Sequence, residues 1–185
     1  MSEYDEITVE NLQSYLTFNL DKETFAVNVL KVIEILEIPK ITKVPKAPDF
    51  LIGVINLRGN VLPVIDARIK FGMESTEATV NTCIIVMNLE IEGEELILGS
   101  LVDAVDEVLD IDPGEIKGSP SIGSQYNPEF IEGVAKIGDD FVMILNIGKV
   151  FSTEDVKTLK DVKPEAKDTK TKSKSVSKAK SKANK

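Results

Sequence analysis

Residues able to carry out acid–base or nucleophilic chemistry are restricted in this chain, because its 185 residues include no histidine. The lack of histidine excludes a phosphoacceptor histidine, a histidine-based triad and an HExxH zinc site. Cys83 has no second cysteine for a disulfide or a zinc site, and within the apolar run CIIVM it is expected to be buried. The side chains left for chemistry are carboxylates, lysines, hydroxyls and arginines.

Three acidic clusters are the remaining candidates for acid–base or metal chemistry. They occupy residues 103–107 (DAVDE), 110–115 (DIDPGE) and 138–140 (GDD). Paired carboxylates can bind divalent cations or act as an acid and a base. None of the three has the pattern of an EF-hand, a P-loop or a nucleophile elbow, and such clusters in an acidic chain are commonly solvated turns. We therefore predict that the protein is not an enzyme and has no catalytic residue, metal or cofactor.

Arg58 stands out by its position in the stretch NLRGN. The following Gly59 and Asn60 predict a tight turn, which would hold the guanidinium on a short, stiff hairpin. An arginine held in this way loses little freedom on binding, and arginine is enriched among the residues that dominate protein interfaces. The competing interpretation is a surface arginine paired with a nearby carboxylate. The residue types alone leave both interpretations open.

An internal repeat identifies the elements that carry Arg58. Residues 48–71 align with residues 128–151 without a gap. The residues shared by the two copies are Pro48 and Pro128, Phe50 and Phe130, Gly53 and Gly133, Val54 and Val134, and Phe71 and Phe151. Asp66 corresponds to Asn146, and both types are favoured at helix N-caps. The repeat predicts two tandem units of one architecture.

The two copies differ at the turn itself. Arg58 corresponds to Gly138, so the shared architecture does not require an arginine at this position. The upstream segments NVLKVIEIL and SLVDAVDEVL match more loosely, with Glu34 opposite Glu107. Because the second copy has glycine where the first has Arg58, Arg58 is more informative about function than the residues that both copies share.

Short alternating runs predict β-strands through both halves. In YLTFNL the apolar Leu16, Phe18 and Leu20 fall on one face and the other residues on the opposite face, as in a half-buried strand. The predicted turns between runs are Asp21-Lys22, Gly59-Asn60, Glu92-Gly93 and Asp139-Asp140. Helices should be few and short, the last one capped by Ser152 and Asp155. We predict an all-β fold of two tandem, small, five-stranded, SH3-like β-barrels with a few short helices.

Charge divides the chain into an acidic body and a basic tail. Residues 157–185 hold eleven lysines and three acids, a net charge of +8, so residues 1–156 carry −17 of a whole-chain −9. The tail is rich in Lys, Ser and Ala and cannot bury enough apolar surface to fold, so we predict disorder. We interpret it as a solvated appendage, with contact to an anionic membrane as the alternative. The acidic body argues against binding to nucleic acid.

The segment FLIGVINLRGNVLPVIDARIKFG with the upstream VIEIL resembles the hallmark of the CheW family of bacterial chemotaxis coupling proteins. LGSLVDAVDEVLDI and FIEGVAKIGDDFVMILNIGKVF resemble the second half of the same domain. We therefore predict a CheW-like domain over residues 11–156, made of two interleaved β-barrel subdomains with the second half starting at about residue 80. The disordered tail would follow over residues 157–185.

The resemblance implies a non-catalytic adaptor of a two-component chemotaxis pathway. CheW-like proteins couple the cytoplasmic tips of methyl-accepting chemoreceptors to the regulatory domain of the histidine kinase CheA. The positions that the family uses for receptor contact correspond to Val32, Glu34, Gly53, Arg58, Cys83 and Gly99. Cys83 departs from the aliphatic residue that is usual there. The resemblance leaves the kinase-binding residues unknown and does not cover the tail.

The docking expected from this resemblance uses the seam between the barrels. Apolar strand faces would offer a trough to the helical hairpin of a receptor, with Arg58 and Glu34 at its margins. The chain has no run of about 18 apolar residues and no signal-like N-terminus, so we predict a cytoplasmic protein that reaches membranes only through receptor arrays. The alternative is a CheW-like scaffold of a non-flagellar chemosensory pathway, for surface motility or gene regulation.

Overall fold

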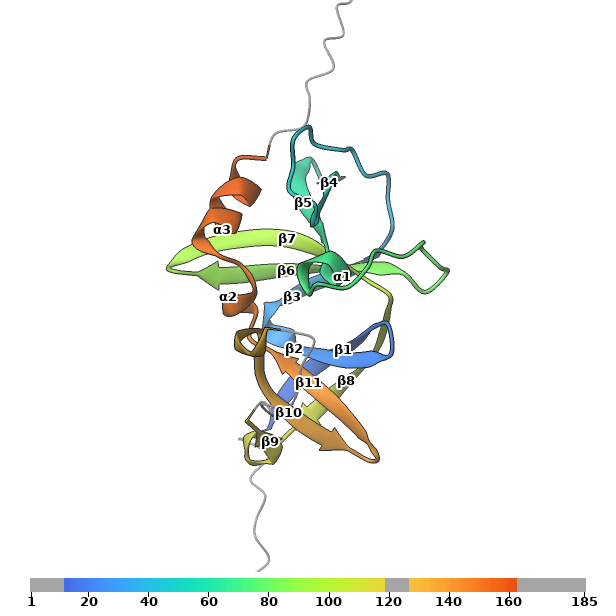
Figure 1. Cartoon of the computed structure of the whole chain (residues 1–185), viewed down its shortest axis with the longest axis vertical. Coiled ribbons are helices and arrows are strands. Elements are labelled where there is room, and N and C mark those ends of the chain that lie inside the picture. The colour runs from blue at the N-terminus through green and yellow to red at the C-terminus, as the bar shows by residue number, and fades with distance from the viewer. Residues whose placement is uncertain (1–11, 119–126, 163–185) are drawn as a thin grey trace, which may run out of the picture.

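Two curled β-sheets, arranged one after the other along the long axis, form most of the molecule (Figure 1). The structure is a computed structural model that describes residues 12–118 and 127–162. The strands are β1 (Gln13–Leu20), β2 (Glu23–Asn28), β3 (Val32–Glu37), β4 (Leu51–Leu57), β5 (Asn60–Asp66), β6 (Cys83–Ile91), β7 (Glu94–Val102), β8 (Ala104–Ile111), β9 (Ile116–Lys117), β10 (Ile131–Ile137) and β11 (Asp140–Leu145). The α-helices are α1 (Ala67–Lys70), α2 (Ile147–Val150) and α3 (Thr153–Lys160). The predicted all-β fold class with short helices is confirmed.

Strand pairing interleaves the two halves of the chain. Sheet A has the strand order β8-β1-β2-β11-β10-β9, and sheet B has the order β3-β6-β7-β5-β4. Sheet B uses consecutive strands, whereas sheet A combines strands from both ends of the chain. In each sheet a repeated hairpin joins the other half through a parallel pair, β5 with β7 and β11 with β2. The predicted division near residue 80 follows the sequence repeat rather than the sheets, and the domain bounds stay a prediction.

The repeated hairpins share their backbone arrangement, as the alignment predicts. Both β4–β5 and β10–β11 are antiparallel and carry a register shift near their start. Equivalent backbone hydrogen bonds close them, from the Asp66 N–H to the Phe50 carbonyl (2.7 Å) and from the Asn146 N–H to the Phe130 carbonyl (2.8 Å). One architecture therefore occurs twice, once in each sheet.

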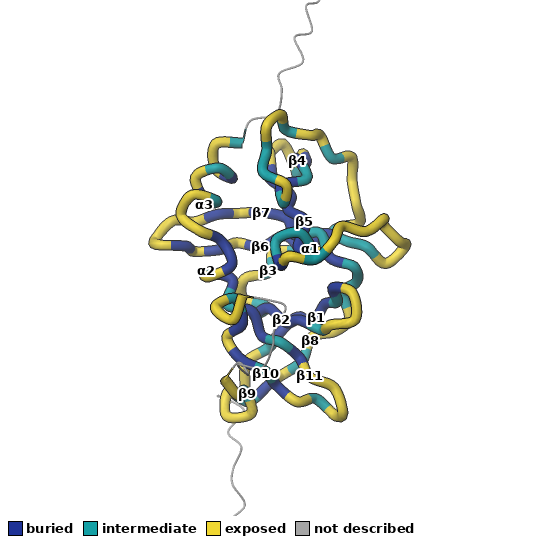
Figure 2. Tube along the Cα trace, in the orientation of Figure 1, coloured by how far each residue is buried: buried dark blue, intermediate teal, exposed yellow. Residues whose placement is uncertain are grey.

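Three buried clusters form the core, seen as dark segments in both sheets in Figure 2. The largest lies between the sheets and includes Leu16, Phe18 and Leu20. The other two lie inside the curl of sheet A and inside the curl of sheet B. Tyr15 and Thr17 are also buried. The expectation of a half-buried strand is wrong here, because sheet A curls around a second core on the face that carries these residues.

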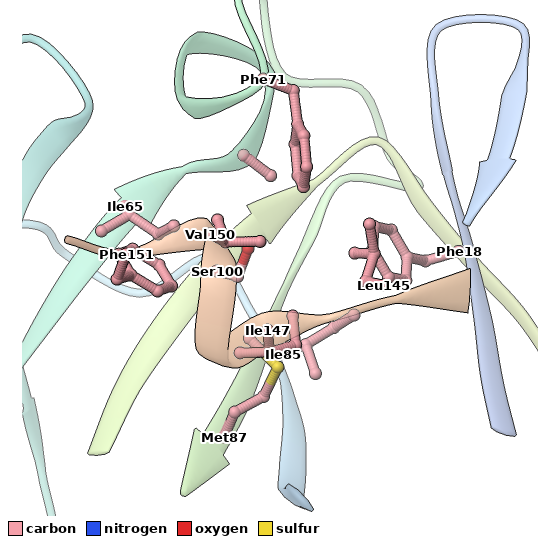
Figure 3. Close-up of a pocket in the computed structure, with 11 residues that line it drawn as sticks. Phe18, Ile65, Phe71, Ile85, Met87, Ser100, Leu145, Ile147, Val150 and Phe151 are labelled. Carbon is pink, nitrogen blue, oxygen red and sulfur yellow. The ribbon is translucent and has the colours of Figure 1, made fainter. Parts of the chain in front are cut away.

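The seam between the sheets is filled by the protein's own side chains. Figure 3 shows residues from both sheets and from α2 converging on a cavity of about 20 Å³. A cavity of this size holds about one water molecule. At this point of the seam the described side chains leave no room for a partner helix, and docking of a helix in the seam stays a prediction.

The C-terminal helix α3 begins as the sequence predicts. The Ser152 hydroxyl accepts from the Asp155 N–H (3.1 Å), and the Asp155 carboxylate accepts from the Ser152 N–H (2.9 Å), which completes a capping box. The helix continues to Lys160 and buries Leu159. The predicted start of the disordered tail at residue 157 is therefore wrong, because residues 157–160 are helical; residues 163–185 lie outside the described residues.

Ion pairs fix α1 and α3 to the sheets. Arg68 of α1 donates from Nε to Asp103 (2.8 Å), and Asp103 also accepts from the Asp21 N–H (2.7 Å) in the β1–β2 turn. Lys70 of α1 donates to Asp155 of α3 (2.7 Å). Sheet A, sheet B and both helices are thereby tied together next to the seam. None of the helices among the described residues has the length and apolar character to cross a bilayer.

Candidate docking site

Strand β3 presents apolar side chains to solvent at an edge of sheet B. Ile33 and Ile35 are 49% and 45% exposed and alternate with Glu34, while Leu30 before the strand is 90% exposed and Ile38 after it is 37% exposed. Among the described residues, β3 pairs only with β6. An apolar edge strand is a ready template for association. We call Ile33 and Ile35 the β3 face.

The turn between β4 and β5 places Arg58 at a left-handed backbone position. Its two loop residues are Arg58 and Gly59, with φ of +50° and +85°. Two-residue hairpin loops of this kind require positive φ at both positions. The predicted turn at Gly59-Asn60 is therefore one residue too late, and so is the predicted turn at Asp139-Asp140, since that loop is residues 138–139.

The conformation of Arg58 is unfavourable for a residue that has a Cβ atom. Gly138 takes the same place in the second hairpin, with φ of +63°, and glycine adopts this region without that penalty. The first hairpin thus keeps a large side chain where the backbone favours glycine. Asp21 and Glu92 begin two other hairpin loops at φ of +56° and +52°, so the backbone alone does not assign a role to the guanidinium.

The Arg58 guanidinium forms a two-pronged ion pair with Glu34. Arg58 Nη1 lies 2.7 Å from Glu34 Oε1, and Nη2 lies 3.0 Å from Oε2. The hydrogen bond and the charge of Glu34 raise the pKa of Arg58. Because Glu34 lies on β3 and Arg58 directly follows β4, the pair connects the two edge strands of sheet B.

The exposed fractions of the Arg58 and Glu34 side chains bear on both interpretations of Arg58, as a surface ion pair and as a binding residue. Its side chain is 71% exposed although it is paired, and that of Glu34 is 21% exposed. The surface ion pair expected by the simpler interpretation is present, and the guanidinium is still open to a partner. An exposed pair of this kind contributes little to stability. Its donors and acceptors are therefore available for exchange with a docking protein.

Two of the predicted contact positions, Gly53 and Gly99, are buried inside sheet B. A Cβ atom on Gly53 would lie 2.3 Å from the Thr42 carbonyl oxygen, and one on Gly99 would lie 2.7 Å from Ile84 Cγ2. Neither residue can present a side chain to a partner. A substitution at either position would instead distort the strands behind the β3 face.

Val32 and Cys83 are half-buried supports of the same edge. Val32 packs against the core between the sheets and lies opposite Met87. Cys83 begins β6 opposite Glu37 of β3, and its burial raises the pKa of the thiol. The thiol therefore stays protonated and is a poor nucleophile at neutral pH.

The structure gathers all six predicted positions on sheet B and its β4–β5 turn, but only Arg58 and Glu34 present polar groups near the surface. The prediction missed Ile33 and Ile35. The alternation in VIEIL contained the signal, since a strand sends every second side chain to the same face and Glu34 to the other.

Taken together, these features define a β-rich domain with an exposed apolar edge strand and an exposed ion pair on the same sheet. Its described residues contain no group of three or more Cys, Asp or Glu side chains placed to hold a metal ion. The CheW-like domain model matches residues 14–155, and the chain belongs to this family. It is thus a CheW-like scaffold of bacterial chemotaxis, a family of non-catalytic proteins.

Known proteins resemble it over most of their length. The chemotaxis protein CheW of Klebsiella aerogenes is 31% identical over 150 residues, which cover 81% of this chain and 88% of that protein. The chemotaxis protein CheW of Rhizobium meliloti is 34% identical over 140 residues, covering 76% and 88%. The crystal structure of the scaffolding protein TtCheW from Thermoanaerobacter tengcongensis superposes with a TM-score of 0.68 at 33% identity, covering 78% of this chain and 90% of that one.

Proposed function

We propose that this protein couples chemoreceptors to the histidine kinase CheA and supports kinase control within a receptor array. The exposed edge strand β3 is the observation that carries the proposal: it has Ile33 and Ile35 on one face and Glu34, paired with Arg58, on the other. A receptor tip is a helical hairpin, and amphipathic helices dock by placing apolar residues against an apolar surface. Recruitment to the membrane would be indirect, through the receptors.

In the proposed complex the exposed isoleucines supply apolar contact and the ion pair supplies selectivity. Ile33 and Ile35 lie on one face of β3 and are free to pack against a helix. Arg58 and Glu34 already satisfy each other, so a partner gains by replacing their mutual hydrogen bonds with matched charged groups. A poorly matched partner would leave one of the two charges unpaired.

Binding to a receptor signalling fragment tests the polar part of this site. We expect Arg58→Ala or Glu34→Ala to weaken binding roughly thirtyfold, as loss of an arginine anchor typically does. Lys136→Ala and Asp139→Ala in the second hairpin are matched controls and should bind as the unmodified protein does. Unchanged affinity of both test variants, with intact melting temperatures, would contradict the proposed site.

The apolar part has its own matched control. Ile35 on β3 corresponds to Val108 on β8, the equivalent edge of sheet A, and Val108 is 55% exposed. We expect Ile35→Asp to weaken receptor binding, whereas Val108→Asp should not. A larger loss for Val108→Asp would move the receptor site to sheet A.

The kinase connection and the pathway need separate experiments. Titration of the CheA regulatory domain should show binding that survives Arg58→Ala, if receptor and kinase use different surfaces. Co-purification from the native cell should recover chemoreceptors together with CheA. Recovery with a kinase of another pathway would favour the non-flagellar alternative, for which the same surface would serve.

A further inference from the structure

The carboxamide of Asn56 is hydrogen bonded to the turn that carries Arg58. Its Oδ1 atom accepts from the backbone N–H of Gly59, at 2.8 Å. Asn56 is itself exposed and lies on β4, two residues before Arg58. The bond therefore connects the last rigid part of the strand to the second residue of the loop. It holds the peptide that follows Arg58 in one orientation.

The second hairpin has neither side chain of this arrangement. Lys136 replaces Asn56, and a lysine side chain has no acceptor atom. Gly138 replaces Arg58 and needs no help to adopt its positive φ. An acceptor for the loop thus occurs in the hairpin that starts with Arg58, while the hairpin that starts with Gly138 lacks it. Asp21 and Glu92 start two further two-residue loops with φ of +56° and +52°, so a positive φ at this place does not by itself require such an acceptor.

The geometry of the ion pair depends on this turn. Both Arg58 nitrogen–oxygen distances to Glu34, 2.7 and 3.0 Å, require the side chain to leave the loop in one direction. A relaxed, right-handed Arg58 would aim its guanidinium elsewhere and lose at least one prong. Asparagine is well suited to the role, because its side chain commonly bonds the backbone of a nearby turn.

We propose that Asn56 is a positioning residue for partner recognition: it holds the β4–β5 turn so that Arg58 stays left-handed, pairs with Glu34 and meets the partner pre-organised. The role in recognition rests on the proposed function, whereas the role in holding Arg58 does not. Pre-organisation strengthens binding by reducing the freedom lost in the complex.

Substitutions that keep or remove the acceptor test the inference in the full chain. Asn56→Leu removes the acceptor at similar size, Asn56→Lys installs the residue of the second hairpin, and Asn56→Asp keeps an acceptor. NMR couplings and Cα shifts of residue 58 report its φ, and guanidinium signals report the pair with Glu34. We expect the Leu and Lys variants to lose the left-handed signature and to bind a receptor signalling fragment about three to ten times more weakly, the loss typical of one hydrogen bond. Asn56→Asp should retain both properties.

A second background separates positioning from direct contact with the partner. When combined with Arg58→Gly, which needs no support, Asn56→Leu should cause no additional loss of binding. Weaker binding with an unchanged Arg58 conformation would overturn the positioning role, and so would an Arg58 that stays left-handed in both Asn56→Leu and Asn56→Lys. If the unmodified protein does not bind receptor fragments, the proposed function fails, and the NMR signals still decide whether Asn56 holds Arg58.

Discussion

The two repeated hairpin-and-helix units share their strand arrangement but send different side chains out of it, and their turns differ, since Gly59 has a φ of +85° and Asp139 has no positive φ. Both have the bulge, the closing backbone hydrogen bond and a glycine that another chain segment approaches closely. The polar side chains found only in the first unit are Arg58, Arg68 and Lys70, which correspond to Gly138, Gly148 and Val150. Backbone features that recur are therefore required by the fold, whereas the cations of the first unit are added to it. Two of them tie elements together, and Arg58 remains largely exposed.

The edge strands of the sheets show the same contrast. On β3 the outward residues are Ile33 and Ile35, whereas the corresponding residues of β8 are Asp106 and Val108. Acidic residues on an edge strand discourage association with other chains. Sheet B therefore has an apolar edge strand, β3, and a polar turn that carries Arg58. The edge strand of sheet A, β8, carries an acidic residue that disfavours unspecific strand pairing. This difference supports the placement of the docking site on sheet B.

The largest effect should come from the glycines that both units share. A Cβ on Gly53 would meet the Thr42 backbone at 2.3 Å, so Gly53→Ala should cost about 3 kcal/mol of unfolding free energy. At Gly133 the nearest atoms are Ile116 Cγ2 at 2.4 Å and the Lys117 carbonyl oxygen at 2.7 Å, both in the two-residue strand β9; the closer one belongs to a side chain, which can move. Gly133→Ala should therefore cost less. Urea denaturation of both variants measures the difference, and equal losses would show that the two bulges are equally constrained.

Replacing Arg58 by the residue of the second hairpin should separate stability from binding. Arg58→Gly removes the backbone strain and an exposed ion pair of little energetic value, so the melting temperature should stay the same or rise. Receptor binding should nevertheless fall by roughly thirtyfold. Gly138→Ala is the reciprocal control, since it introduces a Cβ at the equivalent left-handed position and should lower the melting temperature. A marked loss of stability on Arg58→Gly would mean that the ion pair holds sheet B together.

Acid should weaken the contacts that the first unit makes and the second lacks. Burial would raise the pKa of Asp103, but hydrogen bonds from Arg68 and the Asp21 N–H, with the charge of Arg68, lower it overall. The unfolded state therefore takes up this proton first as the pH falls, and stability present near neutrality is lost between about pH 5 and about pH 2.

Asp103→Asn tests this pH dependence directly. The variant should be less stable than the unmodified protein near neutral pH, by about 1 kcal/mol, and should lose less additional stability in acid. Asp155 should account for part of the remaining acid sensitivity, because its pKa is also lowered, burial being outweighed by Lys70 and the Ser152 cap. Denaturation at a series of pH values measures both slopes, and identical slopes would mean that Asp103 is not involved.

Local patterns predicted the parts of the structure that depend on neighbouring residues. The hairpins and the capping box at Ser152 could be predicted because turn residues, caps and alternation act over a few positions. The family could be predicted because its hallmark is a continuous segment of the chain. The parallel pair of β2 with β11 joins distant segments, and no local pattern specifies it. Burial of Thr17 was missed for the same reason, since a second core on its face follows only from the curl of sheet A.

The sequence did not reveal which of the six predicted contact positions expose a side chain. Family resemblance indicated positions that the structure gathers on sheet B and its turn, but it did not distinguish exposed side chains, such as Arg58, from buried glycines, such as Gly53. That distinction needs a packing environment, which a sequence does not contain. The position of Asn56 in the sequence likewise does not show that its side chain accepts a hydrogen bond from Gly59.

The smallest difference between the units concerns the start of the short helices. The Asp66 carboxylate accepts from the Arg68 N–H at 2.9 Å and caps α1, whereas Asn146 makes no side-chain cap at α2. Asp66→Ala should therefore cost about 1 kcal/mol, and Asn146→Ala should cost close to nothing. Thermal melts of the two variants provide the comparison. Equal losses would imply that packing of the helix against the seam, rather than its cap, fixes the helix start in both units.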